Sequence, residues 1–294
     1  MATVLNFYPF TLLTDLLQMK YLDTTIFNNR SNQRYKTNTQ THWTRSPCGS
    51  NSSEAEKLSK EYFDEIENDR YSSHPWILDA INNFNLKDKR VLEIGFGMGT
   101  DHLCLLRRGA DIHGIDLTLN NSFILKERLK IYGFKSSLIC GDAENLPIAD
   151  ESMDFIYSFG VIHHSPDTGR IVSEIHRILK PGGKCWITVY NKNSIFFWWS
   201  LLLVDWLFKG SYKYESLKER ISKIEYPNDN PDLVIKLYTK KQFKKLFSKF
   251  CTVDCSVKHL VKRDIFYIGP YIPDRIIDFL SGLLGWYIII EAVK

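Results

Sequence analysis

The stretch Val91–Asp101, with the sequence VLEIGFGMGTD, decides the fold of this chain. It predicts a strand, a glycine-rich turn and the start of a helix. Gly95, Gly97 and Gly99 stand at alternate positions, where the backbone can take positive φ and a ligand can approach the main chain closely. The next strand ends in Asp116, an acid about 20 residues after the turn, where it can accept hydrogen bonds from a ribose. Together these features predict the first half of a nucleotide-type α/β site for an adenosine-like ligand.

Length and composition favour one large domain with elaborations. The chain has 294 residues, of which 44% are hydrophobic, enough for a sizeable core. The formal net charge of +4 is small and the basic residues are spread along the chain, so no nucleic-acid partner is expected. The six cysteines contain no CxxC pair and are expected to be reduced residues of a cytoplasmic protein. Export is not expected, because Thr3–Met19 lacks a basic n-region and contains Pro9 and Asp15.

The most apolar run is Ile195–Phe208. It is interrupted by Ser200 and Asp205 and falls short of the ~20 residues that a membrane-spanning helix needs. A buried or interfacial helix is expected here instead. No transmembrane segment is predicted, and peripheral contact with a membrane stays open.

Strands and helices are expected to alternate after the glycine turn. Helices are predicted at 100–108, 120–132 and 168–179, and strands at 111–116, 137–140, 153–159 and 184–190. Apolar strands separated by amphipathic helices indicate parallel βαβ units with helices on both faces of the sheet.

Residues 1–42 are predicted to form an N-terminal extension with a flexible part, since the polar run after residue 28 gives no core-forming period. The domain itself is expected over 43–294. Its first helix is predicted to begin after an N-cap at Ser53 and to run from about 54 to 68. A second helix is expected over 76–84.

A lid insert is expected over about 191–238, on the ligand side of the sheet. It contains the aromatic stretch from Phe196 to Trp206 and a charged helix near 215–223. Thr239 and Gln242 then have the spacing of a capping box, which predicts a helix from there to about 250. A strand over 251–260, a helix over 275–280 and a strand over 285–293 are expected to complete the chain.

The glycine spacing separates two kinds of adenosine ligand. A dinucleotide fingerprint, GxGxxG, needs a glycine where this chain has Thr100, whereas Gly99 gives the pattern GxGxG. The segment 93–99, EIGFGMG, therefore resembles motif I of the class I S-adenosylmethionine-dependent methyltransferases.

The resemblance extends from about Trp43 through most of the chain and is closest to the type 11 group, which includes ubiquinone and menaquinone biosynthesis enzymes. Four further segments match in order and spacing. They are the ribose-binding acid Asp116, the adenine loop GDAENLP at 141–147, the fourth strand DFIYS at 154–158 and the approach to the fifth strand, LKPGGK, at 179–184. Each segment alone is weak, but the set is specific for the superfamily.

The resemblance implies a Rossmann-like, doubly wound sheet of seven strands, mostly parallel with the last strand antiparallel, plus a helical N-terminal arm and a helical lid insert. It implies S-adenosylmethionine as the cofactor. Asp116 is expected to accept hydrogen bonds from both ribose hydroxyls, Asp142 to accept one from the adenine amine, and the Ala143 amide to donate to the adenine ring. The full set of cofactor contacts implied is Glu93, Gly95, Gly97, Gly99, Asp116, Leu117, Asp142, Ala143 and Phe159.

His163 and His164 follow the fourth strand, where methyl donor and acceptor usually meet in this family. A histidine there can take a proton from a hydroxyl, thiol or amine, because its pKa lies near neutrality. The hypothesis is that one of the two assists deprotonation. The alternative is that they pack or order the loop, since many relatives work largely by proximity. No metal site is expected.

The acceptor is expected to be a small or medium-sized, apolar metabolite, natural product or lipid-like molecule, because the insert is aromatic; core packing explains the same side chains equally well. The lysines of helix 240–250 fit a solvated helix face better than a nucleic-acid surface. Two alternatives stay open: an NAD(P)-dependent Rossmann oxidoreductase, and a binding module that keeps the cofactor fold without catalysis.

Overall fold

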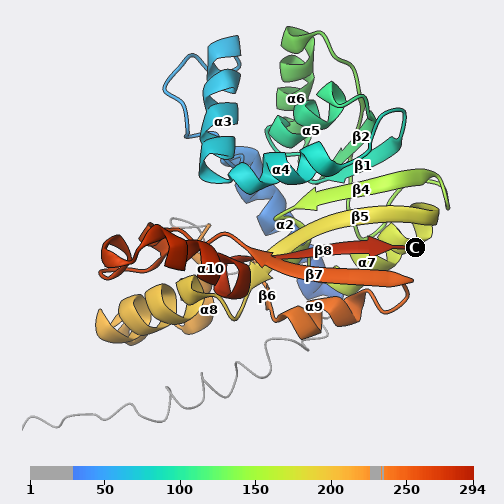
Figure 1. Cartoon of the computed structure of the whole chain (residues 1–294). Helices are drawn as coiled ribbons and strands as arrows, with labels where there is room; N and C mark the ends of the chain where they lie inside the picture. Colours follow the sequence, from blue (N-terminus) through green and yellow to red (C-terminus); the bar gives the residue numbers. More distant parts are fainter. Residues whose placement is uncertain (1–28, 226–232, 234) are drawn as a thin grey trace, which may run out of the picture.

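The computed structural model describes residues 29–225, 233 and 235–294 of the chain. Its centre is a single twisted sheet with the strand order β3-β2-β1-β4-β5-β8-β7 (Figure 1). The eight strands are β1 (Arg90–Ile94), β2 (Asp111–Asp116), β3 (Ser137–Cys140), β4 (Met153–Phe159), β5 (Leu179–Asn191), β6 (Leu237–Tyr238), β7 (Thr252–Lys258) and β8 (Tyr287–Val293).

This sheet confirms the predicted fold and adds one strand. Seven strands form the continuous order, and the eighth, the two-residue β6, pairs only with the end of β5. The last strand, β8, lies between β5 and β7 and runs antiparallel to both, as expected. The other pairs in the order are parallel.

Nine α-helices and several shorter helical turns surround the sheet in the described residues. The α-helices are α2 (Asn29–Arg45), α3 (Lys60–Ser73), α4 (Pro75–Asn83), α5 (Thr100–Arg107), α6 (Leu119–Tyr132), α7 (Thr168–Ile178), α8 (Leu217–Ser222), α9 (Lys240–Leu246) and α10 (Asp274–Leu284). The shorter turns include η1 (Ile162–His164), and a π-helix, η2 (Phe196–Phe208), follows β5. None of these helices is both long and apolar enough to pass through a lipid bilayer.

The two faces of the sheet are covered by different helices because side chains alternate along each strand. Val91 of β1 belongs to a buried cluster with residues of α4 and α5 on one face, whereas its neighbour Leu92 belongs to the cluster that includes residues of α7 and α9 on the other. Phe155 and Ile156 of β4 divide in the same way. Figure 1 shows α4 and α5 on one side of the strands and α9 on the other. Two buried faces explain why the strands are apolar throughout.

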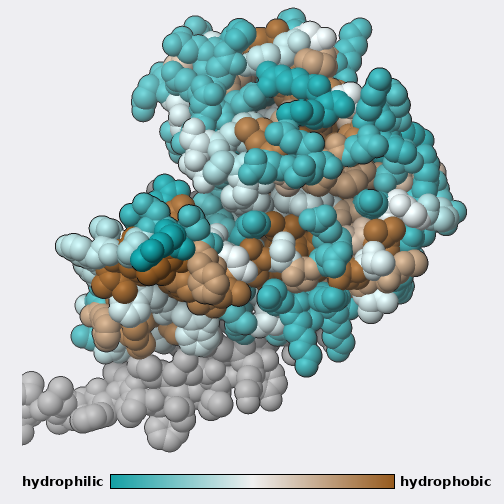
Figure 2. Space-filling model, viewed as in Figure 1, coloured by the Kyte–Doolittle hydropathy of each residue, from teal (hydrophilic) through white to brown (hydrophobic). Residues whose placement is uncertain are grey.

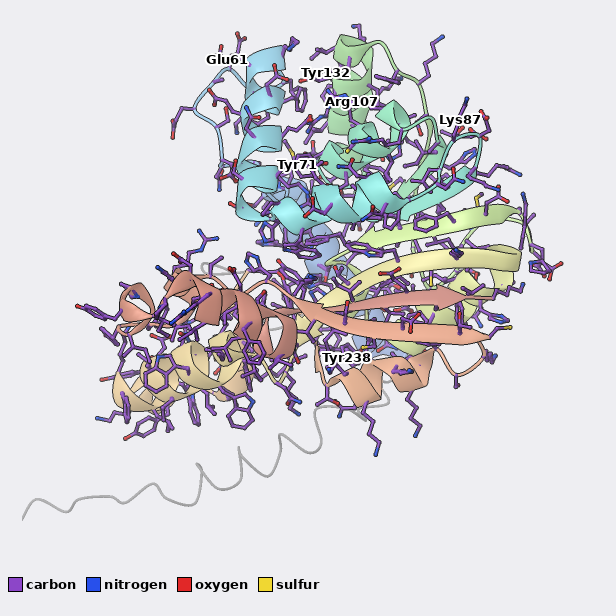
Figure 3. The ribbon with its side chains drawn as sticks, viewed as in Figure 1. Glu61, Tyr71, Lys87, Arg107, Tyr132 and Tyr238 are labelled. Atoms are coloured by element: carbon purple, nitrogen blue, oxygen red, sulfur yellow. The ribbon has the colours of Figure 1, made fainter. Side chains whose placement is uncertain are left out.

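The helix before α4 begins later than the sequence predicts. α3 starts at Lys60 with Ser59 as its N-cap, and the Ser59 side chain accepts a hydrogen bond from the Tyr62 amide at 3.0 Å. The predicted cap, Ser53, instead accepts a hydrogen bond from the Ala55 amide in a local turn. Both serines can accept a hydrogen bond from a nearby backbone amide, so the local sequence does not decide which of them caps the helix. The prediction that the helix starts at residue 54 was wrong. Tyr71 lies near the end of α3, where this helix meets α4 (Figure 3).

Part of the π-helix η2, in the insert after β5, is buried. Phe197 and Trp206 of η2 are each 1% exposed and pack with Trp286 before β8 and with Leu217 of α8. The predicted lid, 191–238, includes residues 226–232 and 234, which lie outside the described residues. Together η2, α8 and α10 extend beyond the carboxyl ends of the parallel strands (Figure 1), and apolar side chains gather on the surface over α10 (Figure 2).

The capping box at α9 is confirmed. The Gln242 amide donates to Thr239 Oγ1 at 3.2 Å, and the Thr239 amide donates to Gln242 Oε1 at 2.9 Å. The helix ends at Leu246, earlier than expected, while its apolar side, Phe243 and Phe247, is fully buried and its lysines are exposed.

Replacing Thr239 with alanine should lower the free energy of unfolding by about 1 kcal/mol, since one amide of the first turn loses its acceptor. Urea denaturation measures this change. Ser248→Ala, at an exposed position beyond the helix end, is the matched control and should change stability by less than ~0.5 kcal/mol. Equal effects of the two substitutions would show that the cap does not stabilise α9.

Candidate active site

A cavity of about 470 Å³ opens at the carboxyl ends of the parallel strands. Five strands contribute to it from their ends: Gly95 after β1, Asp116 in β2, Gly141 after β3, Phe159 in β4 and Tyr190 in β5. Helix α2 adds Lys36 and Trp43, among others. In open α/β sheets ligands bind at this edge, and the volume lies in the range of small-molecule sites.

The glycine turn forms one wall of the cavity. Gly95 and Gly97 line it with φ of +77° and +50°. A Cβ at Gly95 would lie 2.3 Å from Val161 Cγ2, whereas a Cβ at Gly97 would meet nothing within 4 Å. Gly99 does not line the cavity: it caps α5 at φ +74°, and a Cβ there would lie 2.2 Å from Leu125 Cδ1 of α6. The third glycine therefore allows helix packing, while the second presents bare backbone to a ligand.

Asp116 ends β2 at the cavity wall and is 8% exposed. Its Oδ1 accepts hydrogen bonds from the Thr118 amide at 2.9 Å, the Thr118 hydroxyl at 3.0 Å and Asn121 Nδ2 at 3.1 Å. Its Oδ2 accepts one from the Gly97 amide at 3.0 Å. Burial raises the pKa of this carboxyl, and these hydrogen bonds oppose the rise. The carboxylate is thereby held in one orientation beside the glycine turn, and Leu117 lines the cavity next to it.

Asp142 and Ala143 line the cavity beyond β3. Asp142 Oδ2 accepts from Lys36 Nζ of α2 at 2.6 Å, and Lys36 also pairs with Glu144. Burial alone would lower the pKa of Lys36, but the two carboxylates raise it above its ordinary value. The acid expected at the adenine position thus already holds α2 over the cavity. Residues 29–42, within the predicted extension, form most of this helix.

Glu93 and His102 form a buried pair behind the turn. Glu93 lines the cavity and its Oε2 lies 2.8 Å from His102 Nδ1. Burial raises the pKa of Glu93 well above its ordinary value, and burial lowers the pKa of His102 to about 3. Burial therefore favours the uncharged forms of both partners over an ion pair, although the two atoms lie within ion-pair distance.

Phe159, at the end of β4, faces a cation. The Arg70 guanidinium carbon lies 4.5 Å from the centre of the Phe159 ring, a cation–π contact. Arg70 is itself paired with the buried Asp101 of α5 through two hydrogen bonds. These contacts hold the side chains of Arg70 and Phe159 in place where they line the cavity between α3 and β4.

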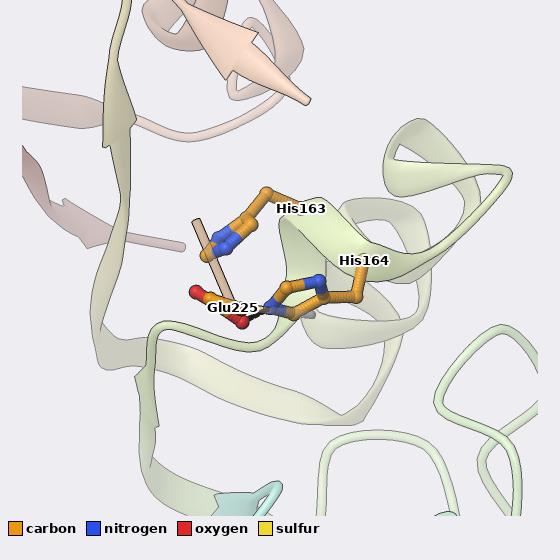
Figure 4. A group of neighbouring side chains, drawn as sticks. All are labelled: His163, His164 and Glu225. Atoms are coloured by element: carbon orange, nitrogen blue, oxygen red, sulfur yellow. Dashed lines mark ion pairs between the residues drawn. The ribbon is translucent and has the colours of Figure 1, made fainter. Parts of the chain in front are cut away.

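The two candidate histidines differ in their access to the cavity. His164 lines the cavity, and its Nε2 lies 3.1 Å from Glu225 Oε2 (Figure 4). His163 is fully buried and does not line the cavity, although its ring centre is only 4.2 Å from that of His164. Burial, and then the neighbouring His164, keep the pKa of His163 well below its ordinary value, so it is neutral at neutral pH. Of the two, only His164 can touch an organic molecule bound in the cavity.

Several residues that line the cavity were missed in the sequence. They are Cys48, Arg70, His74, Tyr190, Glu225, Arg263 and Tyr287. They come from six separate parts of the chain, and no local pattern joins them. The one local feature that could have pointed to any of these residues is the turn at Cys48-Gly49, which precedes the first predicted helix of the domain. All six cysteines are free, and Cys48 is exposed to the cavity.

Two tyrosines of α3 make structural contacts. Tyr62 donates to the Ser50 carbonyl at 3.0 Å, and Tyr71 lies 3.2 Å from Asp101 Oδ1. Neither of them lines the cavity. Within the described residues, no member of Phe196–Phe208 lines it either, which favours core packing for the aromatic stretch.

Comparison with known proteins identifies the central region. Residues 92–187 match a family described as "Methyltransferase domain". A phosphoethanolamine N-methyltransferase of Caenorhabditis elegans is 40% identical over 106 residues, covering 35% of this chain and 24% of the relative. A ubiquinone biosynthesis O-methyltransferase of Coxiella burnetii is 26% identical over 133 residues, covering 44% and 57%. The chain thus spans about a quarter to about half of these relatives.

A solved structure has the same fold. Phosphoethanolamine N-methyltransferase 2 of Haemonchus contortus, in complex with phosphomonomethylethanolamine and S-adenosylhomocysteine, superposes with a TM-score of 0.52 at 19% identity, over 76% of this chain and 52% of that chain. These findings agree with the resemblance drawn from the sequence: residues 92–187 match a methyltransferase domain, and the sheet that contains them has the fold of a solved methyltransferase.

Proposed function

Because residues 92–187 form a methyltransferase domain, we propose that this chain transfers a methyl group from S-adenosylmethionine to a small or medium-sized acceptor with an apolar body. The observation that carries the proposal is the cavity at the strand ends. On the β1 to β3 side it is bounded by the bare glycine turn and two carboxylates, and on the β4 and β5 side by aromatic rings and an ionisable pair.

The first side of the cavity fits the cofactor. The open backbone at Gly97 leaves room for a bulky group where any side chain would intrude. Asp116 Oδ2 accepts a hydrogen bond from only the Gly97 amide among the described residues, which leaves it able to accept one from a ribose hydroxyl. Asp142 and Ala143 lie one strand further along, where an adenine attached to that ribose would reach.

The bound cofactor would supply a methyl group on a sulfonium, which is already a reactive electrophile. The residues of the chain then have three tasks: to hold the acceptor in line, to exclude water and to assist removal of a proton. Trp43, Phe159, Tyr190 and Tyr287 line the second side and would contact an apolar acceptor body. His164, with Glu225 beside it, would assist proton removal on the same side.

Calorimetric titration of the full chain tests the cofactor assignment. S-adenosylmethionine and S-adenosylhomocysteine should bind in preference to NADH. A preference for NADH would overturn the proposal in favour of an oxidoreductase. Incubation with cofactor carrying a labelled methyl group and a metabolite extract should then show methyl incorporation. Cofactor binding without incorporation into any broad extract would favour a binding module instead.

Asp116→Ala should weaken S-adenosylhomocysteine binding by about 10- to 100-fold, because hydrogen bonds to a carboxylate contribute about 1.5–3 kcal/mol. The matched control is Asp111→Ala, at the other end of the same strand, where the side chain is 63% exposed and far along β2 from the cavity. Circular dichroism should show that both variants keep the fold. Unchanged affinity in a folded Asp116→Ala protein would contradict the ribose assignment.

A further inference from the structure

Three side chains from distant parts of the chain converge beside the cavity. His163 and His164 lie in η1 after β4, and Glu225 lies shortly after α8 in the insert. One ligand atom from each lies within 4.8 Å of the other two. Figure 4 shows both imidazole rings and the carboxylate turned toward one another. Two imidazoles and a carboxylate are a common donor set for divalent transition metals.

His163 is the member of this group that packing does not explain. Its side chain is 0% exposed, and neither ring nitrogen has a hydrogen-bond partner among the described residues. Leaving a buried polar group without a partner costs about 1–3 kcal/mol. The contact between His164 and Glu225 does not relieve this, because it leaves both nitrogens of His163 unsatisfied. A neutral imidazole with a free lone pair is the form that binds a metal ion.

Glu225 is held in place as a ligand would be. Its Oε1 accepts a hydrogen bond from the Tyr190 hydroxyl, while Oε2 lies 3.1 Å from His164 Nε2. A hydrogen bond from outside the ligand set orients a metal-binding carboxylate. His164, Glu225 and Tyr190 all line the cavity, so an ion bound here would face the acceptor.

We infer that His163, His164 and Glu225 bind one divalent transition-metal ion, of the Zn²⁺, Fe²⁺ or Mn²⁺ class, with coordination positions left open toward the cavity. Three protein ligands with open positions are typical of a catalytic rather than a structural metal site. This site departs from the sequence prediction of no metal, since adjacent histidines and an acid in a distant insert form no spacing motif.

The consequence for catalysis rests on the proposed function. A hydroxyl of the acceptor that coordinates the ion loses its proton more readily, and that proton passes to solvent water. The electron pair of the oxygen then forms the new bond to the methyl carbon as the bond from this carbon to sulfur breaks, leaving S-adenosylhomocysteine. His164 thus assists deprotonation as a ligand, and His163 contributes although it does not touch the acceptor.

Cobalt titration of the chelator-treated, tag-free full chain tests the site. Co²⁺ alone should bind to one site per chain and produce visible absorption bands. His163→Ala and Glu225→Gln should each weaken this binding by about 100-fold or more, since even the loss of a group that orients a ligand costs 10- to 100-fold. His176→Ala in α7, a half-buried histidine outside the group, is the matched control and should bind Co²⁺ like the wild type.

Absence of saturable Co²⁺ binding to the wild type would overturn the inference, as would wild-type affinity in both His163→Ala and Glu225→Gln. If His163→Ala does not fold, Glu225→Gln decides alone, because the Glu225 side chain is partly exposed and a glutamine can still accept from Tyr190. S-adenosylhomocysteine titration of the same variants should give wild-type affinity. Failure of cofactor binding in the wild type would count against the proposed function without altering the cobalt result.

Discussion

Replacing His164 with alanine is expected to lower the rate of methyl transfer by about 100-fold or more, the usual contribution of assisted proton transfer. The imidazole lines the cavity next to Glu225 and on the same side as Phe159 and Tyr190, where the acceptor is expected. The affinity for S-adenosylhomocysteine should not change, since most of the proposed cofactor contacts lie at the ends of β1 to β3. The measurement is turnover of the acceptor found by labelling, together with calorimetry.

His113→Ala is the control for this prediction, because His113 lies in β2, only partly exposed and outside the cavity. It should leave turnover unchanged. His163→Ala separates two mechanisms: a direct base role for His164 predicts turnover near that of the wild type, whereas the metal site predicts a loss similar to that of His164→Ala. Wild-type turnover in both His163→Ala and His164→Ala would show that neither histidine assists deprotonation.

Replacing Asp101 with alanine should lower the free energy of unfolding by about 3–5 kcal/mol, because it leaves the Arg70 guanidinium without its counter-ion in a buried site. Asp101 is 4% exposed and accepts hydrogen bonds from Arg70 Nε at 2.7 Å, Tyr157 Oη at 2.7 Å and Tyr71 Oη at 3.2 Å. A second nitrogen of Arg70 also donates to this carboxylate, which therefore accepts four hydrogen bonds. These hydrogen bonds connect α3 to α5 and β4.

The effect should depend on pH in a defined direction. Burial alone would raise the pKa of Asp101, but Arg70 and the two tyrosine hydroxyls bring it below its ordinary value. A carboxyl with a lowered pKa stabilises the folded state above its unfolded pKa of about 3.9 and loses this contribution as the pH falls. The gap in stability between wild type and Asp101→Ala should therefore be full at neutral pH and shrink below about pH 4.

Asp150→Ala is the matched control for Asp101. Asp150 also pairs with an arginine, Arg177, at 2.6 Å, but its side chain is 72% exposed. An exposed ion pair contributes about 0–1 kcal/mol, so this variant should unfold close to the wild type in urea. Similar losses at both positions would contradict the argument that burial gives the Arg70–Asp101 pair its large effect.

Most elements of the sheet were predictable because each is encoded locally. β2, β3 and β4 begin and end at the predicted residues, since turn residues or charged residues bound their apolar runs. Errors occurred where two local signals compete: Ser53 and Ser59 both suit an N-cap, and packing of Tyr62 and Phe63 selects the second. The added β6 has only two residues, too short for any periodic pattern.

The cofactor side of the site was predictable for the same reason. Gly95, Gly97 and Asp116 lie within one βαβ unit, where spacing along the chain translates directly into position. Gly99 matched the motif, but the structure places it against Leu125, which the motif could not indicate. For the aromatic stretch from Phe196 to Trp206 the sequence left acceptor contact and core packing open, because composition does not show which way a helix faces. The structure favours packing, since none of these residues lines the cavity.

By itself the sequence determined the α/β alternation, the glycine turn and the two acids after β2 and β3, because short-range sterics and hydrogen bonding act within a few residues. Only the tertiary structure decided which remote side chains complete the cavity. Lys36 from α2, Glu225 from the insert and Tyr287 from β8 meet there through the order of the strands and the packing of helices between them. The buried His163 beside Glu225 illustrates the difference: the two are neighbours only because burial of the insert against the sheet brings them together.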